Sequence, residues 1–208
     1  MAKDLRATCR KCRREGMKLF LKGIRCNGPK CAVTRRAYAP GQHGQARTKL
    51  SNYGIQLREK QKVKRYYGLL EQQFRNYFEL ASKTKGVTGK VLIQLLERRL
   101  DSVILRTGFA VSHNQARQIV RHNFVYVNSR RVNIPSYLIK TGDVIEIRAK
   151  DKTKENFKQN LEQTKDVVKP GWLELDQDNL TAKVVRLPEK EDLQLPIQEQ
   201  LIVELYSK

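Results

Sequence analysis

The chain has 208 residues, of which 42 are Lys or Arg and 21 are Asp or Glu, so its formal net charge at pH 7 is +21. A surplus of this size calls for a polyanionic partner, first of all nucleic acid, since solubility needs a net charge of only about 2 to 8 in a small domain. No stretch reaches the roughly 20 apolar residues that span a bilayer, and the start MAKDLRATCR lacks the apolar core of a signal peptide. We therefore expect no membrane partner and a reducing, cytoplasmic location.

Four cysteines lie near the N-terminus with the spacing Cys9-x2-Cys12-x13-Cys26-x4-Cys31, and the remaining chain has none. Two close pairs separated by a loop are typical of a structural zinc site with four thiolate ligands. The pattern predicts one Zn(II) per chain, which folds a segment too short and too charged to fold alone. An iron–sulfur cluster is the main alternative, whereas disulfides and unrelated free thiols fit the clustering and the reducing compartment poorly.

Residues 33 to 53 contain Gly, Pro and cations but few aliphatic side chains, which predicts an extended loop. Its cations alternate with tyrosines, a mixture that pairs charge with phosphates and aromatic rings with unstacked bases. A flexible basic linker is the alternative. The residues expected to be exposed in this loop are Arg35, Arg36, His43, Arg47 and Lys49, interleaved with Tyr38 and Tyr53.

Residues 56 to 82 carry apolar side chains at helical spacing, and Gly68 predicts a kink or a break within them. Arg58, Lys62 and Arg65 recur at i, i+4 and i+7 and therefore share one face. A basic helical face is often only solvated, but the overall charge of this chain favours contact with phosphates.

The apolar residues between positions 91 and 109 recur at helical spacing, which predicts a core helix in two pieces with a turn near Asp101. The next helix begins with a start signature, because Ser112 can cap it and Gln115 follows three residues later. Its apolar residues should face inward. The polar side opposite them, which we expect to face phosphates, carries Asn114, Arg117 and Arg121.

Residues 124 to 135 predict a β-hairpin with its turn at Asn128-Ser129 and with Arg130 beside the turn, and residues 141 to 150 predict a further strand. Helix, hairpin and strand form a unit that suits structured RNA better than a DNA major groove. Farther on, Trp172 lies among leucines, which favours a place in the core over a role in base stacking.

The segment ERRLDSVILRTGFAVSHNQARQIVRHNFVYVNSRRVNIPSYLIKTGD resembles the RNA-binding module named after the fourth protein of the small ribosomal subunit. The stretches AYAPGQHGQ, SNYGIQLREKQKVKRYYGLLEQQFRNYF and RLDSVILRTGFA resemble the bacterial-type family of that ribosomal protein. The cysteine-rich N-terminus resembles the zinc-bearing variants of the family. The resemblance covers nearly the whole chain, with Asn123 and Ser129 at positions where relatives often have Gly.

The resemblance implies an α+β fold with a mainly helical first domain, which includes the zinc-bound N-terminal segment. The second domain would consist of helices packed on a small antiparallel β-sheet. The implied boundaries are 1–45 for the zinc segment and basic loop, 46–91 with 188–208 for a helical RNA-binding domain, and 92–187 for an inserted α+β domain with the module at about 98–160.

The resemblance implies that the chain is a structural constituent of the small ribosomal subunit. Its members are primary assembly proteins that bind 16S ribosomal RNA at a multi-helix junction in its 5′ domain, and the family suggests a role in translational accuracy. The implied partners are this RNA, neighbouring small-subunit proteins and mRNA near its path into the subunit, with no small-molecule substrate. The resemblance implies RNA contacts by Arg35, Arg36, His43, Lys49, Tyr53, Gln56, Arg58, Lys62 and Arg65 in the first domain, and by Asn114, Arg117, Arg121 and Arg130 in the module.

Two other functions remain open at this point. An RNA-binding regulator off the ribosome, such as a translational repressor, could use the same basic faces. An RNA-modifying enzyme is the least supported, because the three histidines are scattered and neither a paired carboxylate nor a Gly-rich phosphate loop is found.

Overall fold

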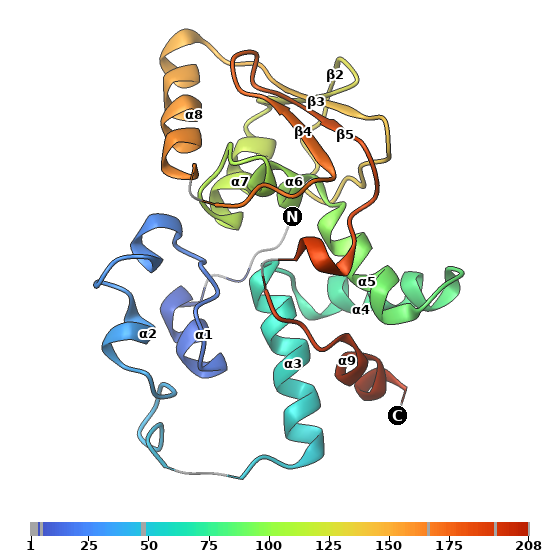
Figure 1. Cartoon of the computed structure of the whole chain (residues 1–208). Helices are drawn as coiled ribbons and strands as arrows, with labels where there is room; N and C mark the ends of the chain where they lie inside the picture. The colour runs from blue at the N-terminus through green and yellow to red at the C-terminus, as the bar shows by residue number, and fades with distance from the viewer. Residues whose placement is uncertain (1–3, 5, 47–48, 166, 194, 208) are drawn as a thin grey trace. The chain divides into compact units, whose positions relative to one another are not determined.

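The computed structural model describes residues 4, 6–46, 49–165, 167–193 and 195–207 (Figure 1). The chain forms two compact units, one of residues 1–92 and 194–208 and the other of residues 93–193. The boundaries drawn from the sequence follow residues 91 and 187, whereas contacts within the structure place them after residues 92 and 193. None of the described helices combines the length and the apolar character needed to cross a membrane.

The first unit is helical. Its longest helix begins at Ser51, whose Oγ accepts a hydrogen bond from the Gly54 N–H at 3.2 Å, and the chain breaks after that helix at Gly68, which has a φ of +64°. The predicted break at Gly68 is therefore confirmed. The elements of this unit are α1 (Thr8–Glu15), η1 (Gly23–Cys26), α2 (Ala32–Arg35), α3 (Asn52–Tyr66), α4 (Glu71–Lys83), the first part of α5 (Thr88–Glu97), and α9 (Glu199–Tyr206).

The C-terminal helix α9 returns to pack beside α3 (Figure 1). Ile202 is fully buried there, and the Tyr206 ring stacks on Phe78 with 4.5 Å between centroids. Glu71, at the start of α4, accepts hydrogen bonds from Lys60 at 2.5 Å and Lys64 at 2.6 Å. Burial raises the pKa of Glu71, but these hydrogen bonds outweigh burial and lower the pKa to about 2. Charge thus joins the last turns of α3 to the start of α4.

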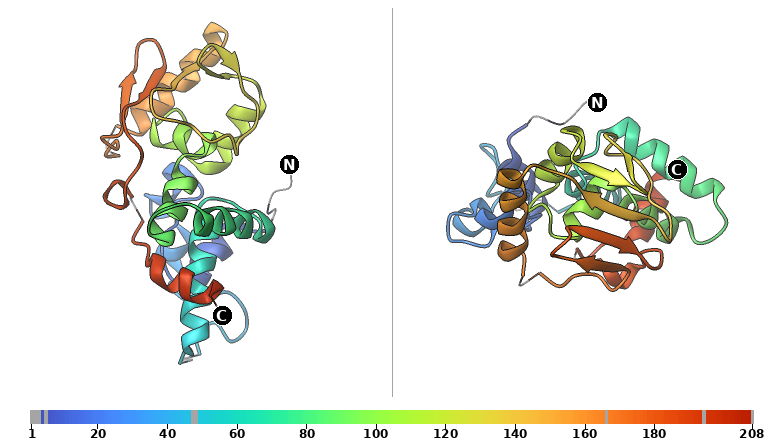
Figure 2. Two further views of the ribbon diagram at one scale, coloured as in Figure 1. Left: turned by 90° about the vertical axis from the view of Figure 1, so that its right-hand side faces the viewer. Right: turned by 90° about the horizontal axis from the view of Figure 1, so that it is seen from above.

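The second unit combines helices with a five-stranded antiparallel sheet in the order β2-β1-β3-β5-β4, as expected of an α+β fold. Alternate residues of the strands, such as Ile145 and Ile147, are buried on one face. Helices α6, α7 and α8 pack against that face (Figure 2). The elements are α6 (Leu100–Arg106), α7 (His113–Arg121), β1 (Val125–Val127), β2 (Arg130–Arg131), β3 (Val144–Ile147), α8 (Asp151–Gln163), β4 (Leu173–Asp176), β5 (Thr181–Val184) and η2 (Lys190–Asp192).

Trp172 is 1% exposed and belongs to the core of this unit, which confirms the expectation that it is a core residue.

The break between α5 and α6 falls at residues 98 and 99, whereas the sequence pattern predicted a turn near Asp101; the predicted position was wrong. The reason is a backbone pairing: Ile139 donates its N–H to the Arg98 carbonyl at 2.9 Å, and Leu100 donates to the Tyr137 carbonyl at 2.9 Å. This pairing replaces the helical hydrogen bonds.

The start of α7 follows the predicted signature with one difference. Ser112 Oγ accepts a hydrogen bond from the Gln115 N–H at 3.4 Å, as in a capping box. The Gln115 side chain, however, reaches back to the Val111 N–H at 2.8 Å, one residue before the cap. Both hydrogen bonds satisfy backbone donors that a helix start would otherwise leave unpaired.

The β1–β2 hairpin turns at Asn128 and Ser129, which have φ values of 48° and 65°. Two central residues with positive φ are what a type I′ turn requires, and its twist suits the flanking strands. The Asn128 side chain fixes the turn, because it donates to Asp143 at 2.8 Å and accepts from the Val144 N–H at 2.9 Å. Ser129 has no such support and adopts a conformation that serine tolerates less well than glycine.

We predict that Ser129→Gly raises the free energy of unfolding of the second unit by about 0.5 kcal/mol, since relief of the left-handed strain exceeds the extra entropy of unfolded glycine. Ser129→Val should lower it by about 1 to 2 kcal/mol, because β-branched residues avoid positive φ. Chemical denaturation of both variants measures the two shifts. Equal stability of the two variants would contradict this account of the turn.

Candidate RNA-binding surface and cysteine site

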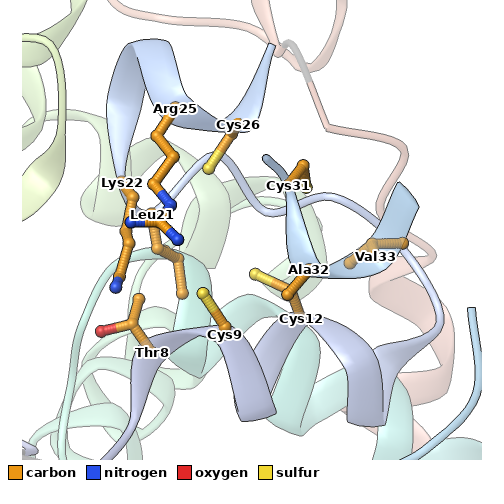
Figure 3. Close-up of a pocket in the computed structure, with 10 residues that line it drawn as sticks. All are labelled: Thr8, Cys9, Cys12, Leu21, Lys22, Arg25, Cys26, Cys31, Ala32 and Val33. Atoms are coloured by element: carbon orange, nitrogen blue, oxygen red, sulfur yellow. The ribbon is translucent and has the colours of Figure 1, made fainter. Parts of the chain in front are cut away.

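The four cysteines line a single pocket in the first unit (Figure 3). Cys9 and Cys12 come from α1, Cys26 ends η1, and Cys31 directly precedes α2. Cys12, Cys26 and Cys31 are buried, and Cys9 is partly buried. The cavity between them holds about 20 Å³, enough for one ion or one water molecule.

The thiols of this pocket differ in acidity. Burial raises the pKa of Cys12 and of Cys26, and neighbouring thiols raise both pKa values further. For Cys31, burial raises the pKa, but hydrogen bonds from the backbone N–H groups of Thr34 and Val33 outweigh it and lower the pKa. Within the described residues, no three Cys, His, Asp or Glu side chains have the arrangement of a formed metal site. The donor set nevertheless suits zinc, which prefers four thiolates in structural sites.

The basic loop that follows the cysteines is anchored at its start. Arg13 of α1 donates hydrogen bonds to the Tyr38 carbonyl at 3.0 Å and the Ala39 carbonyl at 3.3 Å, and its guanidinium lies 4.8 Å from the centre of the Tyr38 ring. This start of the loop is therefore fixed to α1, which argues against a wholly flexible linker. Arg35, Arg36, His43, Lys49 and Tyr53 are all exposed as predicted, and the predicted Arg47 lies outside the described residues.

The predicted basic face of α3 is engaged within the protein. Arg58 and Arg65 both contact Glu15 at the end of α1, the first through Nη1 to Oε1 at 3.4 Å and the second in a shorter ion pair. Lys62 pairs with Glu59 at 2.6 Å and also donates to the Pro196 carbonyl at 2.9 Å. The side chains of Arg58, Lys62 and Arg65 remain 25%, 13% and 16% exposed, and contact of this face with phosphates stays a prediction.

Glu15 holds the cysteine segment to α3. Its side chain is 2% exposed, and burial raises the pKa of this carboxyl while Arg65 and Arg58 oppose that shift. Glu15 is also the only acidic residue between Asp4 and Glu59, and this is the signal by which the sequence could have revealed its role. An isolated acid in a strongly basic segment is a candidate for an internal partner of distant cations.

We predict that Glu15→Ala lowers the free energy of unfolding of the first unit by about 3 kcal/mol, because two partly buried cations lose their shared partner. Glu79→Ala is the control, since Glu79 forms an exposed pair with Arg75 that contributes at most about 1 kcal/mol. Denaturant unfolding of both variants provides the comparison. Two variants of equal stability would contradict the proposed clamp.

Gln56 is buried and donates a hydrogen bond to Glu204 of α9 at 2.9 Å. It therefore serves the packing of α9 on α3 in this structure.

On α7, Asn114 and Arg121 are exposed as expected, and Arg130 is exposed beside the hairpin turn. Arg117 differs, because its side chain is only 8% exposed and its Nη1 lies 4.0 Å from Asp101 Oδ2. The expectation that Arg117 shares an open face with its two neighbours was wrong.

Arg117 belongs to a buried group of charges that the sequence analysis missed. Arg99 forms a two-pronged pair with Asp101, at 3.0 and 2.7 Å, and both side chains are almost fully buried. A second such pair joins Arg106 to Glu97 at 2.9 and 2.5 Å. Removing one partner of such a pair typically costs about 3 to 5 kcal/mol, because the other charge is left buried and unpaired. These arginines are therefore internal and do not face a ligand.

His113, the first residue of α7, is held neutral beside these arginines. Its Nε2 atom is shielded from solvent, although the residue as a whole is partly exposed. Burial lowers the pKa of His113, the nearby Arg106 and Arg99 add to this effect, and together they bring it to about 3. Since the unfolded chain takes up this proton near pH 6.5, acidification favours the unfolded state.

We predict that the free energy of unfolding of the second unit falls as the pH is lowered from 6.5 to 5, by about 1 to 2 kcal/mol on account of His113. His113→Gln should lose this part of the pH dependence, whatever its stability at neutral pH. His122→Gln, which removes an exposed imidazole, serves as the control. Denaturation at several pH values tests this, and an unchanged slope in His113→Gln would contradict it.

Comparison with known proteins assigns the chain to a family. Residues 3–97 match the sequence model described as "Ribosomal protein S4/S9 N-terminal domain", and residues 98–145 match the one described as "S4 domain". The chain is similar to proteins named "Small ribosomal subunit protein uS4" from Acetivibrio thermocellus, at 58% identity over 208 residues, and from Caldicellulosiruptor bescii, at 59% over 208 residues. Both matches cover 100% of each chain.

A relative of the same name from Thermoanaerobacter sp. is 59% identical over 201 residues, which is 97% of each chain. These matches run through both structural units and include the cysteine segment. The chain therefore belongs to the family of small ribosomal subunit protein uS4.

Proposed function

We propose that this protein is a structural constituent of the small ribosomal subunit, in the cytoplasm, that binds 16S ribosomal RNA and nucleates folding of its 5′ domain at a multi-helix junction. The observation that carries this proposal is the full-length identity of 57% to 59% with relatives named "Small ribosomal subunit protein uS4". No catalytic role is part of the proposal.

The charge of the chain supports RNA as the partner. Internal acids hold several of its cations, yet the net charge of +21 leaves a large surplus for phosphates. Exposed candidates occur in both units, in the loop after the cysteines, on α7 and beside the hairpin turn. Contacts to phosphates from two units would bridge neighbouring RNA helices, and such bridging stabilises a junction. The exposed set is Arg35, Arg36, His43, Lys49, Tyr53, Asn114, Arg121 and Arg130.

The proposal extends to other partners and to a metal. Neighbouring small-subunit proteins, and mRNA near its path into the subunit, would contact the assembled protein, and through them it would contribute to translational accuracy. Cys9, Cys12, Cys26 and Cys31 would hold one structural Zn(II), which would draw α1, η1 and α2 together and supply no chemistry beyond folding. The shared pocket of the four thiols supports this assignment.

The function is tested by incubating the full chain with small-subunit ribosomal RNA at moderate salt and mapping backbone protection. Protection confined to one junction of the 5′ domain, and resistant to competition by unrelated RNA, is the expected result. Diffuse protection that disappears with added salt would indicate non-specific binding only, and the proposal would have to be withdrawn.

We predict that Arg121→Gln weakens binding to this RNA and reduces the magnitude of the slope of log K against log salt by about 0.7 to 0.9, the value for one lost phosphate contact. Arg75→Gln is a control of equal charge change, since Arg75 is exposed on α4 and outside the candidate set. Binding isotherms at several salt concentrations give both slopes. If the two variants behave alike, Arg121 has no specific contact.

We predict about one zinc and no iron per chain in the purified protein by elemental analysis. Cys12→Ser should reduce the zinc content to a small fraction and make the cysteine segment sensitive to proteases, because the metal contributes folding energy to this segment. Iron in place of zinc would favour a cluster. Full zinc content in Cys12→Ser would exclude this thiol as a ligand.

A further inference from the structure

The turn between α1 and η1 holds Phe20 in an unfavourable conformation. Its φ is 48°, in the left-handed region that bulky residues avoid, and it is the only aromatic residue with positive φ among those described. The side chain is also 49% exposed. Phe20 therefore combines a strained backbone with an apolar ring in water, and neither feature helps the isolated protein to fold.

The neighbouring residues explain how the turn is held. Leu19 is 1% exposed and Leu21 is 7% exposed, so the residues on either side of Phe20 are anchored in the interior. The Phe20 carbonyl accepts a hydrogen bond from the Gly23 N–H at 3.2 Å, which closes the turn. Glycine could adopt this backbone at position 20 without strain. A phenylalanine at this position indicates that its ring contacts a binding partner, since the side chain is half-exposed and not buried in the core.

The surroundings of Phe20 are strongly cationic. Lys22 and Arg25 are exposed a few residues further on, and both line the rim of the cysteine pocket (Figure 3). Lys18 lies two residues before Phe20 and is partly buried. No acidic residue occurs between Glu15 and Glu59 to neutralise these charges.

We propose that Phe20 stacks on an unpaired base of small-subunit ribosomal RNA, while Lys22 and Arg25 contact the phosphates beside that base. The inference rests on the proposed function and adds a contact residue to it. An exposed aromatic ring flanked by cations matches a single-stranded nucleotide, which offers a flat base and a charged backbone together. A protein partner would have to be acidic over the same few residues, and RNA supplies that charge at every nucleotide.

The test compares Phe20→Leu, which keeps an apolar side chain, with Phe20→Tyr, which keeps a stacking ring. Phe20→Leu should bind the RNA about 5- to 150-fold more weakly than the unaltered protein, the range for loss of one stacked base. Phe20→Tyr should bind within about twofold of the unaltered protein. Leu80→Ala, at an exposed apolar residue of α4, is the matched control and should leave the affinity unchanged.

Salt dependence separates stacking from charge. The slope of log K against log salt should be the same for Phe20→Leu and the unaltered protein, because no phosphate contact is lost. Lys22→Gln should reduce the magnitude of that slope by about 0.7. A reduced slope in Phe20→Leu would overturn the stacking assignment.

Phe20→Gly provides a test that misfolding cannot mimic. This variant relieves the strained backbone, so the free protein should melt at the same temperature as the unaltered protein or higher, and yet it should bind RNA as weakly as Phe20→Leu. If the unaltered protein binds its junction specifically and Phe20→Leu binds equally well, the inference fails while the proposed function stands. If the unaltered protein shows no specific binding, the proposed function fails first.

Discussion

Each unit depends on buried carboxylates that hold cations from more than one place in the chain. Glu15 joins α1 to α3 through Arg58 and Arg65, and it contacts residues 43 and 50 positions away. In the second unit, Asp101 holds Arg99, just before α6, and Arg117, in the middle of α7, while Glu97 holds Arg106 at the end of α6. Because acidic residues number 21 against 42 basic ones, the placement of each acid decides which cations become internal.

The cations left without an internal acid define the surface available to a polyanion. Several of them lie in loops and at helix and hairpin ends, such as Arg36, Arg121 and Arg130. Such a surface repels itself in the free protein, and RNA relieves that repulsion when it binds. The same division explains why a chain this basic can still have an ordered interior: its buried arginines are neutralised in pairs, as at Arg99 and Arg106.

Local features of the sequence predicted local structure well. Ser112 with Gln115 marked a helix start, Asn128-Ser129 marked a turn, and Gly68 marked a helix break, because each depends on a few adjacent residues. The exposure of Arg117 was predicted wrongly, and the internal ion pairs of the arginines on α3 were not foreseen. Periodicity identifies the residues that share a helical face, but it does not show which carboxylate from a distant segment lies opposite that face. Phe20 carried no signal between Leu19 and Leu21, because its φ becomes visible only in the folded chain.

The division between internal and surface arginines can be measured directly by chemical modification of the full chain with an arginine-specific reagent, followed by mass spectrometry, with and without small-subunit ribosomal RNA. We predict that Arg99, Arg106 and Arg117 resist modification in both states, since they are buried in ion pairs. Arg36, Arg121 and Arg130 should react in the free protein and be protected by the RNA. Ready modification of the first group in the free protein, or unchanged reactivity of the second group on RNA binding, would contradict this account.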